Sequence, residues 1–260
     1  YTGQSSVQAG ALSVATINSV GGGSVSSNLG APTTIANGTI DLGAAATTGQ
    51  LTYTGTGETT DRVINLAGTT GGATIEQSGA SPLKFTSDLA ATGLGAKTLT
   101  LQGSTAGTGE LAGAIVDSSS GATSVTKAGT GTWTLSAVNT YTGTTAVAAG
   151  RLVLANANAL GATGAASVTT VANGATLDLN GQSIAEQIGD NLGLDGFAGT
   201  GAGGRAHFRI HLAQKNLADD LGAPGHHAAS DRRYTARSLR SSHGDSVRAV
   251  ARCGQWHSDD

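Results

Sequence analysis

The sequence predicts an all-β protein built as a parallel β-helix (a β-solenoid), followed by an irregular or disordered C-terminal tail. Three observations predict it. Apolar residues alternate with small polar residues over short runs, each run ends at glycine or asparagine, and a longer pattern recurs along the chain. Together these features are typical of short strands that are joined by tight turns and stacked as coils.

Composition limits the kind of core that the chain can build. Glycine supplies 41 of 260 residues, aromatic residues 3% and charged residues 12%, against roughly 25% charged residues in ordinary globular domains. A core of bulky side chains is therefore not available. The formal net charge is only −3, whereas disordered chains usually combine low hydrophobicity with high net charge. A narrow core lined by valine, leucine and isoleucine fits both facts.

The expected strands also indicate which residues face that core. In the run GTGTWTLS, Trp133 and Leu135 share one face while Thr132 and Thr134 take the other. The same alternation occurs at four further pairs: Ile64 and Leu66, Leu99 and Leu101, Leu152 and Leu154, and Leu177 and Leu179. Coils stacked roughly 4.8 Å apart would join these residues into one core and align Thr, Ser and Asn in ladders. A sandwich, the alternative, normally has larger and more aromatic inward faces.

An internal repeat supports stacking. YTGQSSVQAGALSVATINSVG, from Tyr1, matches YTGTTAVAAGRLVLANANALG, from Tyr141, without a gap. After a short insertion, TTIANGTIDLG from Thr33 matches TTVANGATLDLNG from Thr169. Because the spacing is about 140 residues, each unit must contain several coils of ~20–25 residues, and we expect ~8–10 coils in all.

The chain divides after Gly204. Residues 1–204, the expected solenoid, hold 37 of the 41 glycines and no histidine, with 5 basic and 11 acidic residues. Residues 205–260 hold all 6 histidines and Cys253, the single cysteine, with 9 basic and 6 acidic residues. This basic tail has two explanations that stay open, a natural extension and an out-of-frame translation. One cysteine excludes an internal disulfide and a cysteine-based zinc cluster.

Targeting signals are not evident in the sequence. No run approaches the roughly 18–20 consecutive apolar residues of a membrane helix, and no basic-then-apolar leader opens the chain. Because the first residue is Tyr1 rather than methionine, we expect a fragment whose export signal lies upstream.

The segment KAGTGTWTLSAVNTYTGTTAVAAGRLVL, from Lys127 to Leu154, resembles the autotransporter-associated β-strand repeat of bacterial type V autotransporter passengers. YTGQSSVQAGALSV at Tyr1 is similar to the second half of that repeat, and Leu51 to Gly68 resembles a segment common between repeats. The resemblance implies a right-handed parallel β-helix that is exported to the bacterial cell surface or beyond. It also implies a C-terminal membrane β-barrel, which the tail does not resemble, so any contact with a membrane would depend on a barrel missing from this sequence.

Candidate catalytic residues are few, and we assign no catalytic, cofactor-binding or metal-binding residue. Glu58 with Asp61, and Asp190 with Asp195, are the carboxylate pairs considered for glycoside cleavage, and solvated loops explain them better. Residues 1–204 contain no histidine for a serine-protease triad. The glycine-rich strings at Gly55 and Gly199 lack the lysine of a phosphate loop and are expected to be turns. No cofactor is expected.

Two further groups of residues have a functional and a structural interpretation. Trp133 and Tyr141 could form a sugar-binding platform, but a core tryptophan and a turn-anchoring tyrosine bonded to backbone are favoured, because both belong to the repeat. In the tail, five histidines and the run DRRYTARSLR could suggest a metal or a nucleic acid. Incidental side chains are favoured there, and no nucleic acid is expected. The histidines are His207, His211, His226, His227 and His243.

The sequence therefore favours a non-enzymatic passenger fragment, a structural stalk or adhesin-like rod with a ligand on a host or neighbouring cell. The alternative is a β-helix enzyme that degrades polysaccharide, or a carbohydrate-binding module.

Overall fold

A computed structural model describes residues 1–21, 26–104, 107–164 and 167–190. In these ranges, 17 strands form three sheets of three, six and eight strands. All strand pairs within these sheets are parallel. The parallel β-helix is thus confirmed, while the right hand of its winding stays a prediction. The tail lies outside the described residues.

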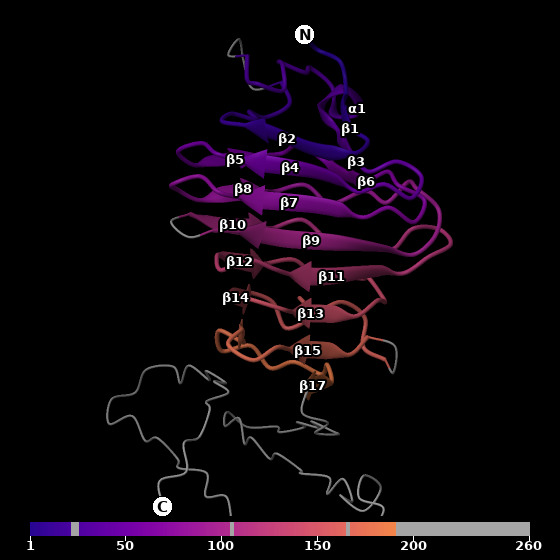
Figure 1. The fold of residues 1–260 in the computed structure, drawn as a ribbon, viewed down its shortest axis with the longest axis vertical. Coiled ribbons are helices and arrows are strands. Elements are labelled where there is room, and N and C mark those ends of the chain that lie inside the picture. Colours follow the sequence, from indigo (N-terminus) through magenta and orange to yellow (C-terminus); the bar gives the residue numbers. More distant parts are fainter. Residues whose placement is uncertain (22–25, 105–106, 165–166, 191–260) are drawn as a thin grey trace, which may run out of the picture.

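The three sheets form the faces of the solenoid, and their strands stack one above another along its length (Figure 1). The 8-stranded sheet contains β2 (Gly10–Val14), β4 (Gly49–Tyr53), β7 (Ala73–Gln77), β9 (Lys97–Gly103), β11 (Thr123–Lys127), β13 (Thr145–Val147), β15 (Thr169–Val171) and β17 (Ile188–Asp190). The 6-stranded sheet contains β5 (Glu58–Thr60), β8 (Leu83–Phe85), β10 (Thr108–Leu111), β12 (Thr132–Leu135), β14 (Arg151–Leu154) and β16 (Thr176–Asp178). The 3-stranded sheet contains β1 (Ser5–Val7), β3 (Ile40–Leu42) and β6 (Ile64–Leu66).

Coil length is regular except at the N-terminal end. From β4 to β17, register partners in the 8-stranded sheet follow one another at the coil length expected from the sequence, roughly 20–25 residues. The step from Leu12 in β2 to its partner Leu51 in β4 is much longer. This step includes the short helix α1 (Ile35–Gly38), whose N-cap Thr34 accepts a hydrogen bond from the amide of Asn37. Within the described residues, no helix has the length and apolar character needed to cross a membrane.

The core is a set of columns in which each inward side chain stacks on the one a coil away. One column of the 8-stranded sheet contains Leu51, Ile75, Leu101, Lys127, Val147 and Val171. Inward residues alternate with outward ones, as in the buried–intermediate–buried pattern of β4. The alternation predicted from the sequence is confirmed at Trp133, Leu135, Leu152 and Leu154, which are all fully buried.

Trp133 fits this narrow core because its neighbour in the column is a glycine. Gly109 of β10 is its register partner, and a Cβ atom built on Gly109 would lie 2.4 Å from the indole ring. On its other side Trp133 stacks against Leu152. The indole Nε1 donates to the carbonyl of Gln102 at 2.9 Å. The bulk of the tryptophan is therefore accommodated by the layer beside it.

Lys127 is a fully buried cation in an otherwise apolar column. Its Nζ donates to three carbonyl oxygens, those of Ala128 at 2.6 Å, Gly129 at 2.8 Å and Ala149 at 3.0 Å. The ammonium thus satisfies carbonyls at the turns of two successive coils. Burial lowers the pKa of Lys127 to about 8.

Glu186 is a buried acid near the C-terminal end of the described solenoid, 4% exposed. Burial raises the pKa of its carboxyl group to about 7, and the Ser167 hydroxyl opposes the shift. Since the folded protein holds this proton more tightly than the unfolded chain, the associated stability is present at low pH and lost as pH rises towards 7.

We expect Gly109→Ala to destabilise the protein by about 1–3 kcal/mol, because the new methyl group overlaps the Trp133 ring. Urea unfolding followed by circular dichroism measures the change. Gly3→Ala is the control, because nothing lies within 4 Å of a Cβ at Gly3. Adding Trp133→Leu should recover part of the loss, and equal effects of Gly3→Ala and Gly109→Ala would contradict the packing argument.

We expect the free energy of unfolding to fall between about pH 4.5 and pH 7, by at most ~1.4 kcal/mol per pH unit from Glu186. In Glu186→Gln this dependence should flatten, because the amide does not ionise. Unfolding curves at several pH values measure it. Glu110→Gln, which alters a partly exposed ion pair with Lys84, is the control and should keep the slope.

Candidate functional site

The first predicted carboxylate pair, Glu58 and Asp61, anchors backbone. Glu58 begins β5 and accepts hydrogen bonds from the amides of Ile17 at 2.8 Å and of Asn18. Asp61 accepts from the amide of Val20 at 2.7 Å. Both acids are half-buried, so the expectation of a solvated loop is corrected. These carboxylates hold the chain that follows β2 over the edge of the 6-stranded sheet.

Arg62, which the sequence analysis did not single out, is buried beside them with no exposed surface. Its Nη2 donates to the carbonyl of Leu29 at 2.9 Å and to the side-chain oxygen of Asn18 at 2.6 Å. Burial lowers the pKa of the guanidinium, and the nearby charges of Tyr1, Glu58 and Asp61 oppose this shift. The cluster therefore sets a buried cation near two acids where the chain that follows β2 contacts β5.

Three further carboxylates bind neighbouring coils. Glu76 accepts hydrogen bonds from Gln50 at 2.6 Å and Gln102 at 3.0 Å, which come from the strands on either side. Glu110 pairs with Lys84 of the adjacent strand at 2.9 Å. Asp117 accepts from the amide and hydroxyl of Thr142. Within the part of the chain that the structure describes, no three His, Cys, Asp or Glu side chains gather as a metal site.

Trp133 and Tyr141 are both fully buried. A platform for a sugar ring needs an exposed aromatic face, so the structural interpretation is confirmed for both. One detail differs from the expectation. The Tyr141 hydroxyl bonds to the hydroxyl of Thr145 at 2.6 Å instead of to backbone, and burial raises the pKa of Tyr141. Tyr141 therefore anchors its turn through a side chain of the next strand.

Several candidates cannot be placed. Asp190 ends β17, while Asp195, Gly199 and the tail candidates from His207 to Cys253 lie outside the described residues. The predicted turn at Gly55 is found, where the amide of Gly57 donates to the Tyr53 hydroxyl at 3.1 Å.

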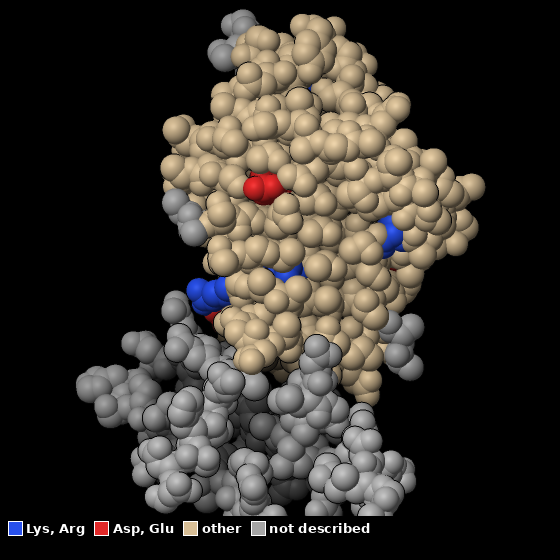
Figure 2. Space-filling model, viewed as in Figure 1, with Lys and Arg blue, Asp and Glu red and all other residues tan. Residues whose placement is uncertain are grey.

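The outer face of the 8-stranded sheet is the broadest regular surface of the solenoid. Figure 2 shows one face of the molecule on which charged side chains are sparse. On this sheet the Gln50–Glu76–Gln102 ladder crosses three strands, and Thr74, Thr100 and Thr126 follow one another in register. The sequence signal that could have found the ladder is the equal spacing of its three members along the chain.

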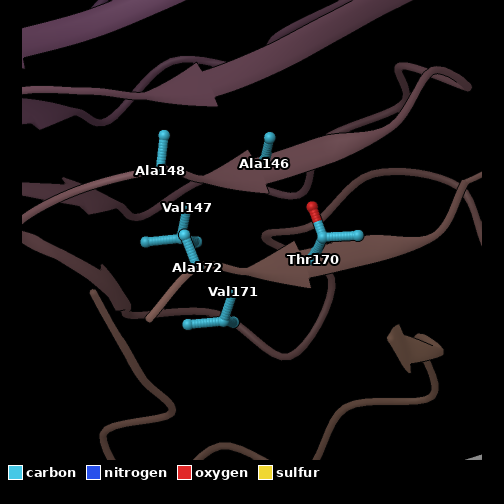
Figure 3. Close-up of a pocket in the computed structure, with 6 residues that line it drawn as sticks. All are labelled: Ala146, Val147, Ala148, Thr170, Val171 and Ala172. Atoms are coloured by element: carbon cyan, nitrogen blue, oxygen red, sulfur yellow. The ribbon is translucent and has the colours of Figure 1, made fainter. Parts of the chain in front are cut away.

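Further towards the C-terminal end of the same sheet, beyond β11, a shallow hollow of about 180 Å³ lies over β13 and β15 (Figure 3). The hollow exists because the side chains around it are small. It is lined by Ala146, Val147, Ala148, Thr170, Val171 and Ala172. It carries no ionisable group. Its lining suits a weak apolar contact, with the Thr170 hydroxyl as its one polar side-chain group.

Comparison with known proteins agrees with this architecture. Residues 125–154, from within β11 to the end of β14, match the passenger-associated-transport-repeat family. Over 149 residues the chain is 36% identical to the "Adhesin BmaC autotransporter" of Brucella suis biovar 1 (strain 1330). That alignment covers 56% of this chain and 4% of the relative's length. No solved structure matches the chain significantly. The chain thus carries a match to the passenger-associated transport repeat at residues 125–154, with parallel strands stacked on both sides of it.

Proposed function

We propose that the chain is a segment of an adhesin-like surface passenger, where it acts as a non-enzymatic rod outside the cell. The observation that carries this proposal is the unbroken stacking of the 8-stranded sheet from β2 to β17. At roughly 4.8 Å per strand, such a sheet spans about 35 Å. A rod of this kind holds whatever follows it at a set distance from the cell.

The carboxylates support a structural role. Glu58, Asp61 and Asp117 accept bonds from backbone amides of other segments, and Glu76 and Glu110 bond side chains of adjacent strands. An acid that already accepts hydrogen bonds in a coil contact is a poor general base for an incoming substrate.

The relative's printed name supports the adhesin-like part, since it describes an adhesin exported as an autotransporter. We expect a ligand on a host cell or a neighbouring cell. The sparse charge of the face in Figure 2 favours a neutral surface over a nucleic acid, whose phosphates call for a basic patch.

A display experiment separates a rod from an adhesin or an enzyme. The full chain is placed between a surface anchor and a test binding domain on a non-adherent bacterium. We expect the chain to raise bead capture above that of a flexible Gly/Ser linker with the same number of residues, because a stacked rod keeps its length. Gly109→Ala should lose part of this gain, and Gly3→Ala should keep it.

Two further measurements could contradict the proposal, one on the same cells without the binding domain and one on the purified chain. Strong attachment to host cells by the chain alone would make it an adhesive surface in its own right. Release of reducing sugar from a polysaccharide panel by the purified chain would overturn the non-enzymatic proposal.

A further inference from the structure

Two stretches with matching sequences lie in different sheets of the solenoid. Residues 1–14 match residues 141–154. In the second copy, β13 belongs to the 8-stranded sheet and β14 to the 6-stranded sheet. In the first copy, the matching strand β1 belongs to the 3-stranded sheet and β2 to the 8-stranded sheet. The first copy is therefore rotated by one face relative to the second.

The mismatch continues downstream. Thr169–Val171 forms β15, but the matching residues Thr33 to Ile35 belong to no strand, and Ile35 begins α1. Likewise β16 lies in the 6-stranded sheet, whereas the matching strand β3 lies in the 3-stranded sheet.

Apolar side chains of the first copy are exposed where their counterparts are buried. Tyr1 is 68%, Leu12 37% and Ile35 67% exposed. Their counterparts Tyr141 and Leu152 are fully buried, and Val171 packs against the core. Of the five large apolar residues exposed in the described part of the chain, three belong to this segment. The three side chains are therefore exposed at positions whose counterparts pack in the core.

Local geometry is nevertheless the same in both copies. Gly10 and Gly150 turn the chain with φ of 74° and 66°. The carbonyl of Tyr1 accepts from the amide of Ala31, and that of Tyr141 from the amide of Ala162, each at 2.9 Å. The copies thus differ in the sheet they join and not in how they turn.

The length of the first step leaves room for another coil. Leu12 pairs with Leu51 across a far longer stretch of chain than the one that separates Leu51 from its next partner, Ile75. The shortest coil of the same sheet runs from Val171 to Asp190. In the register of β13 and β15, Val7 would pair with Ile35, and a coil from Ile35 to Tyr53 of β4 would be one residue shorter than that coil.

We propose that residues 1–21 and 26–42 have a second arrangement, in which their strands belong to two successive coils in the register of β13 to β16. Ser5–Val7 and Thr33–Ile35 then extend the 8-stranded sheet, and Gly10–Val14 and Ile40–Leu42 extend the 6-stranded sheet beyond β5. In this arrangement Glu58 and Arg62 lose their contacts with the residues that follow β2, and β5 gains a neighbouring strand instead. The solenoid becomes one coil longer. It does not depend on the proposed function.

Asp41 reports which arrangement is present. In the described one its register partner is Ser6. In the second one its partner is Ser13, because the matching residues Val153 and Asp178 are partners. Register partners on neighbouring strands lie within the Cα separation that a disulfide spans, about 4.4–6.8 Å.

The test is disulfide trapping in the full chain with Cys253→Ser. Three cysteine pairs are compared under mild oxidation: Ser6→Cys with Asp41→Cys, Ser13→Cys with Asp41→Cys, and Thr126→Cys with Ala146→Cys, register partners common to both arrangements. Ser13→Cys with Ala146→Cys, five strands apart in the 8-stranded sheet, gives the rate of chance encounters. We expect all three partner pairs to cross-link faster than this reference. A Ser13–Asp41 pair that reacts no faster than the reference overturns the proposal.

A second variant makes the trapping specific. Ile35→Asp alters a side chain that is 67% exposed in the described arrangement but buried against the core in the second. We expect it to slow Ser13–Asp41 cross-linking at least ~10-fold, since a carboxylate is costly to bury, and to leave the Ser6–Asp41 rate unchanged. Val138→Asp, at a residue 53% exposed elsewhere, should change neither rate. Equal slowing of both pairs by Ile35→Asp would also overturn the proposal.

Discussion

Parallel pairing of each strand with the strands one coil before and after it is the interaction on which the rest of the structure depends. A coil has no partner within itself, so its backbone groups are satisfied only when coils stack in register. Stacking then aligns inward side chains in columns and outward polar side chains in ladders. The outermost strands carry the cost of this design, because one edge of each has no strand beside it. At β5, the amides of Ile17 and Asn18 and the carboxylate of Glu58 cover that edge.

Polar side chains reinforce the stacking where the backbone turns. Lys127 gathers carbonyl oxygens from two coils, and Glu76 joins glutamines from the strands on both sides. Only 12% of the residues are charged, and several of these side chains hold neighbouring coils together. A solenoid with little other charge is the result, and its faces offer small hydroxyl and amide groups to the surroundings.

Much of the fold could be predicted because the signals are local. The alternation at Trp133 and Leu135 depends only on residues that are close in sequence, and so do the turns at glycine. Both features are found in the structure. The candidate site was harder, since Glu58 contacts amides far earlier in the chain and Lys127 meets a carbonyl of the next coil. Neither partner can be identified without the register of the coils. The sheet that β1 and β2 join is also set by neighbouring layers, which is why matching sequences reach different faces.

Trp133 and Gly109 have a consequence for how such proteins diversify. In a core column that is one residue wide, each side chain contacts only the side chains of the coils before and after it. A larger side chain in one coil therefore requires a smaller one in the next coil. The two coils must be inherited together. A gene duplication that copied only the Trp133 coil would set one indole against another indole instead of against Gly109. Repeat units longer than a single coil, such as the long repeat that relates Tyr1 to Tyr141, carry their complementary layers with them. The shortest segment that can be duplicated without a clash is therefore set by side-chain volume, and it is longer than a single coil.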